Sequence, residues 1–220
     1  MQQRRYVITW RKASAPIWNK ATILLPTGHA IMDLDGLSDF PNLIWQHHVR
    51  RLVRQVGGRR YGVSATALDT LRRRLILGQD STLGGCQFVG LKKGTKTSQF
   101  YVVRELGRVQ YECMVEAGDD VIFAGCWRVC VELSGRLISI GTAQDEGITK
   151  AAVQPPDIIN NLPFMIRRTI PVLCTLDGAL VYPQIQTGSS RPTNVKRGVL
   201  ACFLGHNNNR AANNIEKIGK

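Results

Sequence analysis

Residues 45–105 decide the fold that this sequence predicts. They begin with the basic segment WQHHVRRLVRQVGGRRYG (45–62), continue through LDTLRRRLILGQDSTLGGCQFVGLKKG (68–94) and end in the apolar run FYVVRE (100–105). Apolar residues recur at helical spacing in the basic segment 45–62 and at the start of the segment 68–94. Short apolar runs separated by a turn come after these two helical patterns. The stretch therefore predicts two basic amphipathic helices around a Gly-Gly turn, followed by a β-hairpin.

The two predicted helices each have one apolar face and defined ends. Gly57 and Gly58 end the first helix, because glycine readily adopts the left-handed conformation common at helix C-termini. Ser64 is the expected N-cap of the second helix. The apolar faces consist of Trp45, Val49, Leu52, Val53 and Val56 in the first helix, and of Leu68, Leu71 and Leu75 in the second.

The same helices are rich in arginine and poor in acid. Residues 37–78 contain eight arginines, no lysine and two acids, Asp39 and Asp69, so the local charge is 8 − 2 = +6. A solvated helical surface is one interpretation. A polyanionic partner is favoured over it, because the guanidinium fork fits phosphate in a bidentate way. The candidate RNA-binding residues are Arg50, Arg51, Arg54, Arg59, Arg60, Arg72, Arg73 and Arg74.

The hairpin predicted after the helices has a basic loop, KKGTKTS (92–98). Its lysines, Lys92, Lys93 and Lys96, are candidates for a secondary phosphate contact. Equally, lysines in such a place discourage edge-to-edge aggregation of strands. The sequence leaves both interpretations open.

Composition points to the same class of partner. The chain has 220 residues, a net charge of +13 and a pI near 9.9, which favours nucleic acid or an anionic membrane surface. No apolar run approaches the roughly 20 residues needed to span a bilayer, and MQQRRYVITW (1–10) lacks the apolar centre of a signal peptide. We therefore favour nucleic acid over a membrane and expect a cytoplasmic protein.

No residue pattern in the sequence indicates catalysis or metal binding. The six cysteines form no C-x-x-C pair. The four histidines are not separated from them in the sequence by the numbers of residues typical of zinc sites. We expect the cysteines to act as small apolar residues in a reducing compartment. The glycine-rich phosphate loops and the nucleophile elbow of known enzyme classes are absent from the sequence. We therefore expect no catalytic residue, cofactor or metal in this chain.

Outside the central stretch, local patterns predict further elements. A hairpin is expected at 21–35, a strand with a bend or a turn at Gly125 in VIFAGCWRVCVEL (121–133), another strand at 137–143 and a short helix at 145–154. Pro163 is expected to open a helix that closes before Pro171, and Asp177-Gly178 to form a hairpin turn. Residues 1–20 mix aromatic and basic residues, which fits either base stacking or a frayed terminus.

These elements predict an α+β protein: a short basic helical connector, then a small β-rich domain with short helices. The expected divisions are 1–78 for the N-terminal hairpin and helical connector, and 79–186 for the α+β domain. Residues 187–220 are basic and rich in asparagine and turn residues, and we expect them to form a disordered tail.

The chain resembles one family over residues 21–185. The order LVRQVGGRRYG (52–62), a leucine-spaced helix, TLGGCQFV (82–89) and VVRE (102–105) resembles the C-terminal half of bacterial tRNA(Ile)-lysidine synthetases, particularly the proteobacterial ones. AGDDVIFAGCWRV (117–129) and LPFMIRRTIPVLCTLDGALVYPQ (162–184) resemble two later segments of that family. Where the family tends to have Asp-Gly-Arg-Phe, this chain has Ala124-Gly125-Cys126-Trp127.

The resemblance implies a role in tRNA recognition. The family uses ATP, with Mg, and lysine to convert the wobble cytidine of tRNA(Ile) with a CAU anticodon to lysidine. This chain resembles the tRNA-recognising C-terminal part and has no Ser-Gly-Gly-x-Asp-Ser loop, which grips ATP in the family. We expect it to be inactive alone, as a truncated product or as the partner of a separate ATP-pyrophosphatase polypeptide. The alternative is a free-standing nucleic-acid-binding module without catalytic activity.

Overall fold

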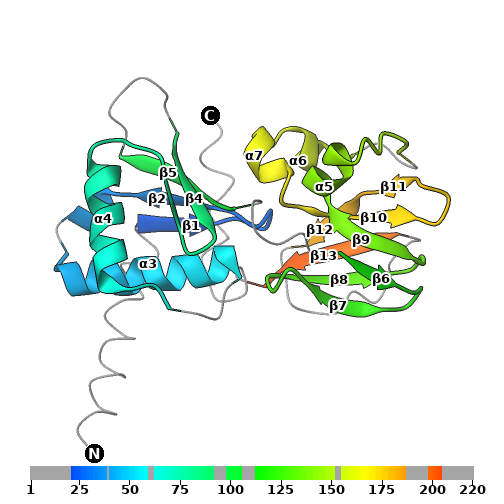
Figure 1. Cartoon of the computed structure of the whole chain (residues 1–220), viewed down its shortest axis with the longest axis horizontal. Coiled ribbons are helices and arrows are strands. Elements are labelled where there is room, and N and C mark those ends of the chain that lie inside the picture. The colour runs from blue at the N-terminus through cyan, green and yellow to red at the C-terminus, as the bar shows by residue number, and fades with distance from the viewer. Residues whose placement is uncertain are drawn as a thin grey trace, which may run out of the picture.

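A computed structural model describes residues 21–38, 40–58, 62–91, 98–105, 112–151, 155–186 and 198–204. The fold is α+β, and its described part consists of two units placed side by side along the long axis (Figure 1). The first unit holds residues 21–105 and the second holds residues 112–204. None of the helices in these ranges is long and apolar enough to cross a membrane.

The first unit is an antiparallel five-stranded sheet with strand order β1-β2-β5-β4-β3 and two longer helices. Helix α3 packs against β4 and β5, and α4 packs against β3 and α3. The elements are β1 (Thr22–Leu24), β2 (Ala30–Asp33), α2 (Asp35–Ser38), α3 (Asn42–Gly57), α4 (Ala65–Ile76), β3 (Ser81–Leu83), β4 (Cys86–Gly90) and β5 (Gln99–Arg104).

Both predicted helices are confirmed, and their apolar faces are buried. All eight side chains of the two predicted faces are among the buried residues. Helix α3 ends at Gly58, whose φ of 68° is the left-handed conformation that glycine adopts without strain. Ser64 Oγ accepts the Ala67 N–H at 3.2 Å and so caps α4. The predicted hairpins at 21–35 and on either side of KKGTKTS (92–98) are confirmed as β1–β2 and β4–β5.

The predicted division between residues 78 and 79 falls inside the first unit. Strand β5 pairs with β2, so β3, β4 and β5 complete the sheet that begins with β1 and β2. The sequence patterns predict the two hairpins but neither β3 nor the pairing of β2 with β5. Helices α3 and α4 separate β2 from β5 along the chain. The change from one unit to the next occurs between 105 and 112 instead.

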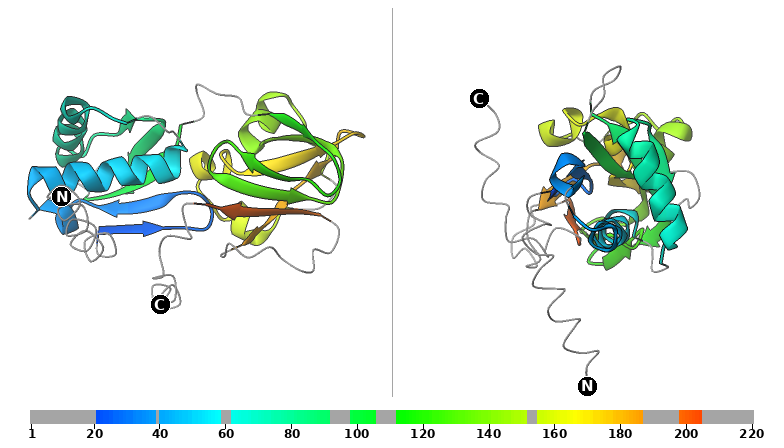
Figure 2. Two further views of the ribbon diagram at one scale, coloured as in Figure 1. Left: turned by 90° about the horizontal axis from the view of Figure 1, so that it is seen from below. Right: turned by 90° about the vertical axis from the view of Figure 1, so that its left-hand side faces the viewer.

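The second unit contains two four-stranded sheets, ordered β11-β10-β9-β6 and β12-β13-β8-β7 (Figures 1 and 2). All pairings are antiparallel except that of β12 with β13. The elements are β6 (Cys113–Val115), β7 (Asp120–Phe123), β8 (Trp127–Val131), β9 (Gly135–Ser139), α5 (Ile140–Asp145), α6 (Asp157–Asn160), α7 (Phe164–Arg167), β10 (Pro171–Thr175), β11 (Leu180–Val181), β12 (Pro183–Gln186) and β13 (Val199–Phe203).

Two predictions for the second unit are confirmed. Helix α7 follows Pro163 and ends before Pro171, and β10 and β11 form a hairpin around Asp177-Gly178. The segment 121–133, predicted as a strand with a bend or a turn at Gly125, forms most of β7 and all of β8, which pair antiparallel around that turn. The chain reverses at Ala124 and Gly125, whose φ angles are 56° and 71°, so the glycine that suggested a bend belongs to a full turn.

The predicted strand at 137–143 and helix at 145–154 are wrong at their shared boundary. Strand β9 ends at Ser139, and α5 occupies Ile140–Asp145. The Oγ of Ser139 accepts the Thr142 N–H at 3.0 Å, which starts a helix within an apolar run that suits a strand. Helix α5 is capped at Glu146, before most of the predicted helix at 145–154. Ala151 forms an isolated β-bridge with Leu180. Residues 152–154 lie outside the described ranges.

The predicted disordered tail is also wrong where the structure describes it. Strand β13 lies inside its sheet between β12 and β8, and all five of its residues are buried. The Phe203 ring packs edge to face on Trp127, with ring centres 5.5 Å apart. The asparagine-rich and turn-rich flanks hid a short apolar run that is long enough for one buried strand.

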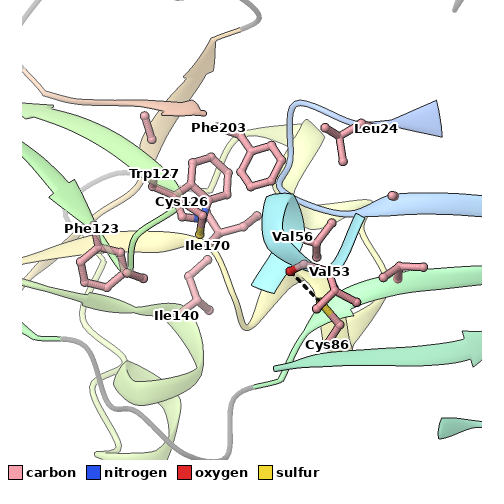
Figure 3. Close-up of a cluster of buried hydrophobic side chains, with 14 of the residues drawn as sticks. Leu24, Val53, Val56, Cys86, Phe123, Cys126, Trp127, Ile140, Ile170 and Phe203 are labelled. Carbon is pink, nitrogen blue, oxygen red and sulfur yellow. Dashed lines mark hydrogen bonds between the residues drawn. The ribbon is translucent and has the colours of Figure 1, made fainter. Parts of the chain in front are cut away.

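The two units meet at a joint with a continuous apolar core. The joint consists of the β1–β2 turn, the end of α3 and Arg104 on one side, and the β7–β8 turn on the other. Arg104 Nη1 donates to the Ala124 carbonyl oxygen at 2.5 Å and lies 2.8 Å from Cys126 Sγ. Figure 3 shows Trp127 and Phe203 of the second unit lying toward the part of the first unit that carries Leu24 and Val56. The joint therefore fixes the surfaces of the two units relative to each other.

Candidate nucleic-acid interface

Three of the predicted RNA-binding arginines lie on α3, away from its buried face. Arg54 is exposed, and Arg50 and Arg51 are half-buried. Successive residues of a helix are turned by about 100°, so Arg50 and Arg54 share one side while Arg51 lies further round. The long apolar face packed against β4 and β5 fixes this orientation.

A polar network joins α3 to α4 and contains the acid nearest to these arginines. Asp69 Oδ1 accepts hydrogen bonds from Asn42 Nδ2 and Gln46 Nε2, both at 3.0 Å. These bonds, led by that from Asn42, lower the pKa of Asp69. The carboxylate is therefore held by two amides of α3 rather than by a guanidinium.

Two of the predicted arginines belong to the edge of this network. Arg50 donates from Nε to the Val63 carbonyl oxygen at 3.1 Å and from Nη2 to Gln46 Oε1 at 3.4 Å. Arg72 donates to Asn42 Oδ1 at 3.0 Å, and its guanidinium lies 5.6 Å from the centre of the Trp45 ring. Both side chains therefore help to pack α3 on α4 as well as carrying charge.

The three consecutive arginines of α4 point in different directions, as helical geometry requires. Arg72 faces α3, whereas Arg74 reaches the Asp80 carbonyl oxygen, beyond the end of its own helix, at 3.2 Å. Arg73 is exposed and bonds Thr70 one turn earlier, at 3.3 Å. Of the three, Arg73 is the one whose exposed side chain has hydrogen bonds only within its own helix, among the residues that the structure describes.

Positive charge is distributed differently in the two units. In the described ranges, no carboxylate forms an ion pair with the α3–α4 arginines Arg50, Arg54, Arg72, Arg73 and Arg74. The second unit instead pairs Arg128 with Asp120, Arg136 with Glu112 and Glu146, Lys150 with Asp177, and Arg168 with Asp145. The first unit thus keeps guanidinium charge available to an external anion.

The remaining predicted contact residues lie outside the described residues: Arg59, Arg60, Lys92, Lys93 and Lys96. Sequence reasoning missed the contribution of Asn42, Gln46 and Asp69. Their spacing gives a signal, because Asn42 and Gln46 are four residues apart on one helix face and Asp69 and Arg72 are three apart on another. Only the packing of α4 on α3 brings these two faces together.

The two buried histidines serve the fold of the first unit. His48 Nε2 lies 2.6 Å from Thr22 Oγ1, and His29 Nδ1 lies 3.0 Å from Thr27 Oγ1. Burial lowers the pKa of each to about 4, so both are neutral at pH 7. Within the described residues, no group of three or more His, Cys, Asp or Glu side chains is placed to hold a metal ion.

Comparison of the chain with known protein families and with curated protein sequences found no match in either.

Proposed function

We propose that this chain is the tRNA-binding portion of a tRNA(Ile)-lysidine synthetase, and that it binds through the arginines of α3 and α4. The observation that carries the proposal is that, within the described residues, no carboxylate forms an ion pair with Arg50, Arg54, Arg72, Arg73 or Arg74, whereas the second unit pairs four of its cations. Guanidinium groups whose charge is not paired with an internal carboxylate are suited to bidentate contact with phosphate.

The net charge indicates the class of ligand, a polyanion. The family resemblance indicates the particular ligand, tRNA(Ile). A net charge of +13 favours any polyanion, whereas the motifs at 52–62, 82–89, 102–105, 117–129 and 162–184 resemble those of the lysidine-forming ligases. A tRNA substrate also implies a cytoplasmic protein.

Catalysis would then require a second component. These 220 residues contain no Ser-Gly-Gly-x-Asp-Ser loop, so we propose that an ATP-pyrophosphatase domain outside them binds the ATP and its Mg. Incubation of this chain with ATP, lysine and a tRNA(Ile) transcript should release no AMP and form no lysidine. Turnover above background by the chain alone would overturn this part of the proposal.

The binding surface can be tested with two variants of equal charge change. Arg54→Gln with Arg73→Gln removes two exposed arginines of the first unit, whereas Arg128→Gln with Lys150→Gln removes two paired cations of the second. We expect the first pair to weaken tRNA(Ile) binding and to reduce the slope of log affinity against log salt by about 1 to 2, and the second pair to change both less. Equal losses would show that binding follows total charge and not this surface.

A comparison among RNAs separates the ligase portion from a free-standing module. The proposal predicts tighter binding to tRNA(Ile) with a CAU anticodon than to a tRNA of another anticodon at the same salt. Equal affinities would favour the free-standing nucleic-acid-binding module.

A further inference from the structure

Helix α7 and the residue that follows it bring an exposed aromatic ring beside two half-buried arginines. Phe164 is 59% exposed, and Arg167 and Arg168 follow it by three and four residues, the spacing that places side chains together on a helix. The guanidinium carbons of Arg167 and Arg168 lie 6.0 and 5.5 Å from the centre of the Phe164 ring. Both distances fit cation–π contact.

The buried side of the same short helix fixes this arrangement. Ile166 is buried, and α7 begins directly after Pro163. Arg168 donates from Nη2 to the two carboxylate oxygens of Asp145 at 2.8 and 2.6 Å. A β-carbon at position 141 would lie 3.0 Å from Arg168 Nε, so Gly141 leaves room for the arginine to lie against α5.

Arg167 differs from the other cations described above for the second unit. It has no carboxylate partner within the described residues. Its Nε, like that of Arg168, is buried without a hydrogen-bond acceptor there. Its charge also counteracts the rise in the pKa of Tyr182 that burial causes, so Arg167 lies near this phenol as well as near Phe164. A guanidinium that has no internal carboxylate and lies beside an exposed ring is suited to contact with an external anion.

We propose that Phe164, Arg167 and Arg168 form a stacking site for an unpaired nucleobase of RNA. An exposed aromatic face stacks on any base, and adjacent arginines add cation–π and phosphate contacts. Asp145 holds Arg168 in place, which leaves Arg167 to meet the neighbouring phosphate. This inference rests on the proposed function, RNA binding, and adds a site in the second unit that recognises single-stranded nucleotides.

The position of α7 suits a ligand that also reaches the first unit. Helix α7 contacts β5 across the boundary between the units, where Figure 1 shows it above the joint. Paired nucleotides bound at the α3–α4 arginines and an unpaired nucleotide at α7 would then lie on two surfaces of one rigidly joined protein.

The test compares a short single-stranded oligoadenylate with an RNA duplex, using fluorescence anisotropy on the full chain. Phe164→Ala should weaken oligoadenylate binding roughly tenfold and leave duplex binding unchanged, because stacking contributes only where a base face is free. Phe164→Tyr should retain the affinity, and Phe164→Leu should not. Ile158→Ala is the matched control, because Ile158 is a 50% exposed apolar residue on the neighbouring helix α6.

The outcomes separate this inference from the proposed function. If the unaltered chain binds neither RNA, RNA binding itself is wrong. If it binds both and Phe164→Ala weakens neither, the α7 site is wrong while the proposed function stands. Full affinity in Phe164→Leu would also overturn the site, because it would show apolar contact without stacking; an unchanged melting temperature confirms that each variant is folded.

Discussion

Gly28, in the turn between β1 and β2, faces Trp127 of β8 so closely that a β-carbon at position 28 would lie 2.6 Å from the indole Cζ2. The contact joins the two units, and the backbone at Gly28 has a φ of 83°. Both features exclude a larger residue there.

The first prediction follows from that contact. Gly28→Ala should destabilise the protein by about 2 to 4 kcal/mol, the sum of left-handed strain and overpacking, measured by chemical denaturation. Gly178→Ala is the control, because Gly178 has a φ of 78° and nothing within 4 Å of an added β-carbon. Gly178→Ala should lose only the stability that the left-handed strain costs. An equal loss of stability in the two variants would show that the residues of the joint move to accommodate the added methyl group.

The second prediction concerns β13. Phe203→Ala should cost about 3 to 5 kcal/mol, because the side chain is fully buried against Trp127. Leu133→Ala, an apolar residue that is 38% exposed, should change the stability by less than about 0.5 kcal/mol. A free energy of unfolding that Phe203→Ala leaves unchanged would show that this segment does not pack as a strand in solution.

The third prediction is a loss of stability in mild acid. The pKa of His29 and of His48 is about 4 in the folded protein and 6.5 in the unfolded chain. Between these values the unfolded chain binds more protons, so the free energy of unfolding falls as the pH drops from about 6.5 to 4. At pH 5 each histidine should contribute a loss of roughly 2 kcal/mol. His48→Gln should flatten the pH dependence measured by thermal denaturation, and an unaltered slope would show that His48 is not buried in its neutral form.

The fourth prediction tests the network between α3 and α4. Asp69→Ala should lower the melting temperature, because the amides of Asn42 and Gln46 lose their shared acceptor. Glu132→Ala provides a control of equal charge change, since Glu132 is exposed and its side chain has no hydrogen bond within the described part of the chain. Equal melting temperatures for the two variants would show that the network contributes nothing to stability.

Elements defined by local signals could be predicted from the sequence. The apolar faces of α3 and α4, the Ser64 cap and the turn at Asp177 each depend on residues only a few positions apart. The pairing of β5 with β2 could not be predicted, because helices α3 and α4 separate the two strands along the chain. Segment 199–203 carries an apolar signal that its polar flanks outweighed in the sequence interpretation.

The candidate interface likewise has some features that the sequence predicts and others that depend on how the helices pack. That arginines of α3 lie off its apolar face follows from helical periodicity alone. That Arg50 and Arg72 are engaged by Val63, Gln46 and Asn42 requires the packing of one helix on the other. The cluster at Phe164 has a sequence signal in its spacing, yet the exposure of the ring depends on how α7 lies on the second unit.

The order of strands in the second unit also bears on how the chain folds as it is synthesised. The sheet of the first unit is complete once β5 has emerged, whereas β8 must wait for β13, which follows it by about 70 residues. Such distant pairing is slow, and domains made earlier fold first. The first unit therefore folds while the surface that later meets Trp127 is still bare, and chaperones would encounter that apolar surface before the second unit covers it.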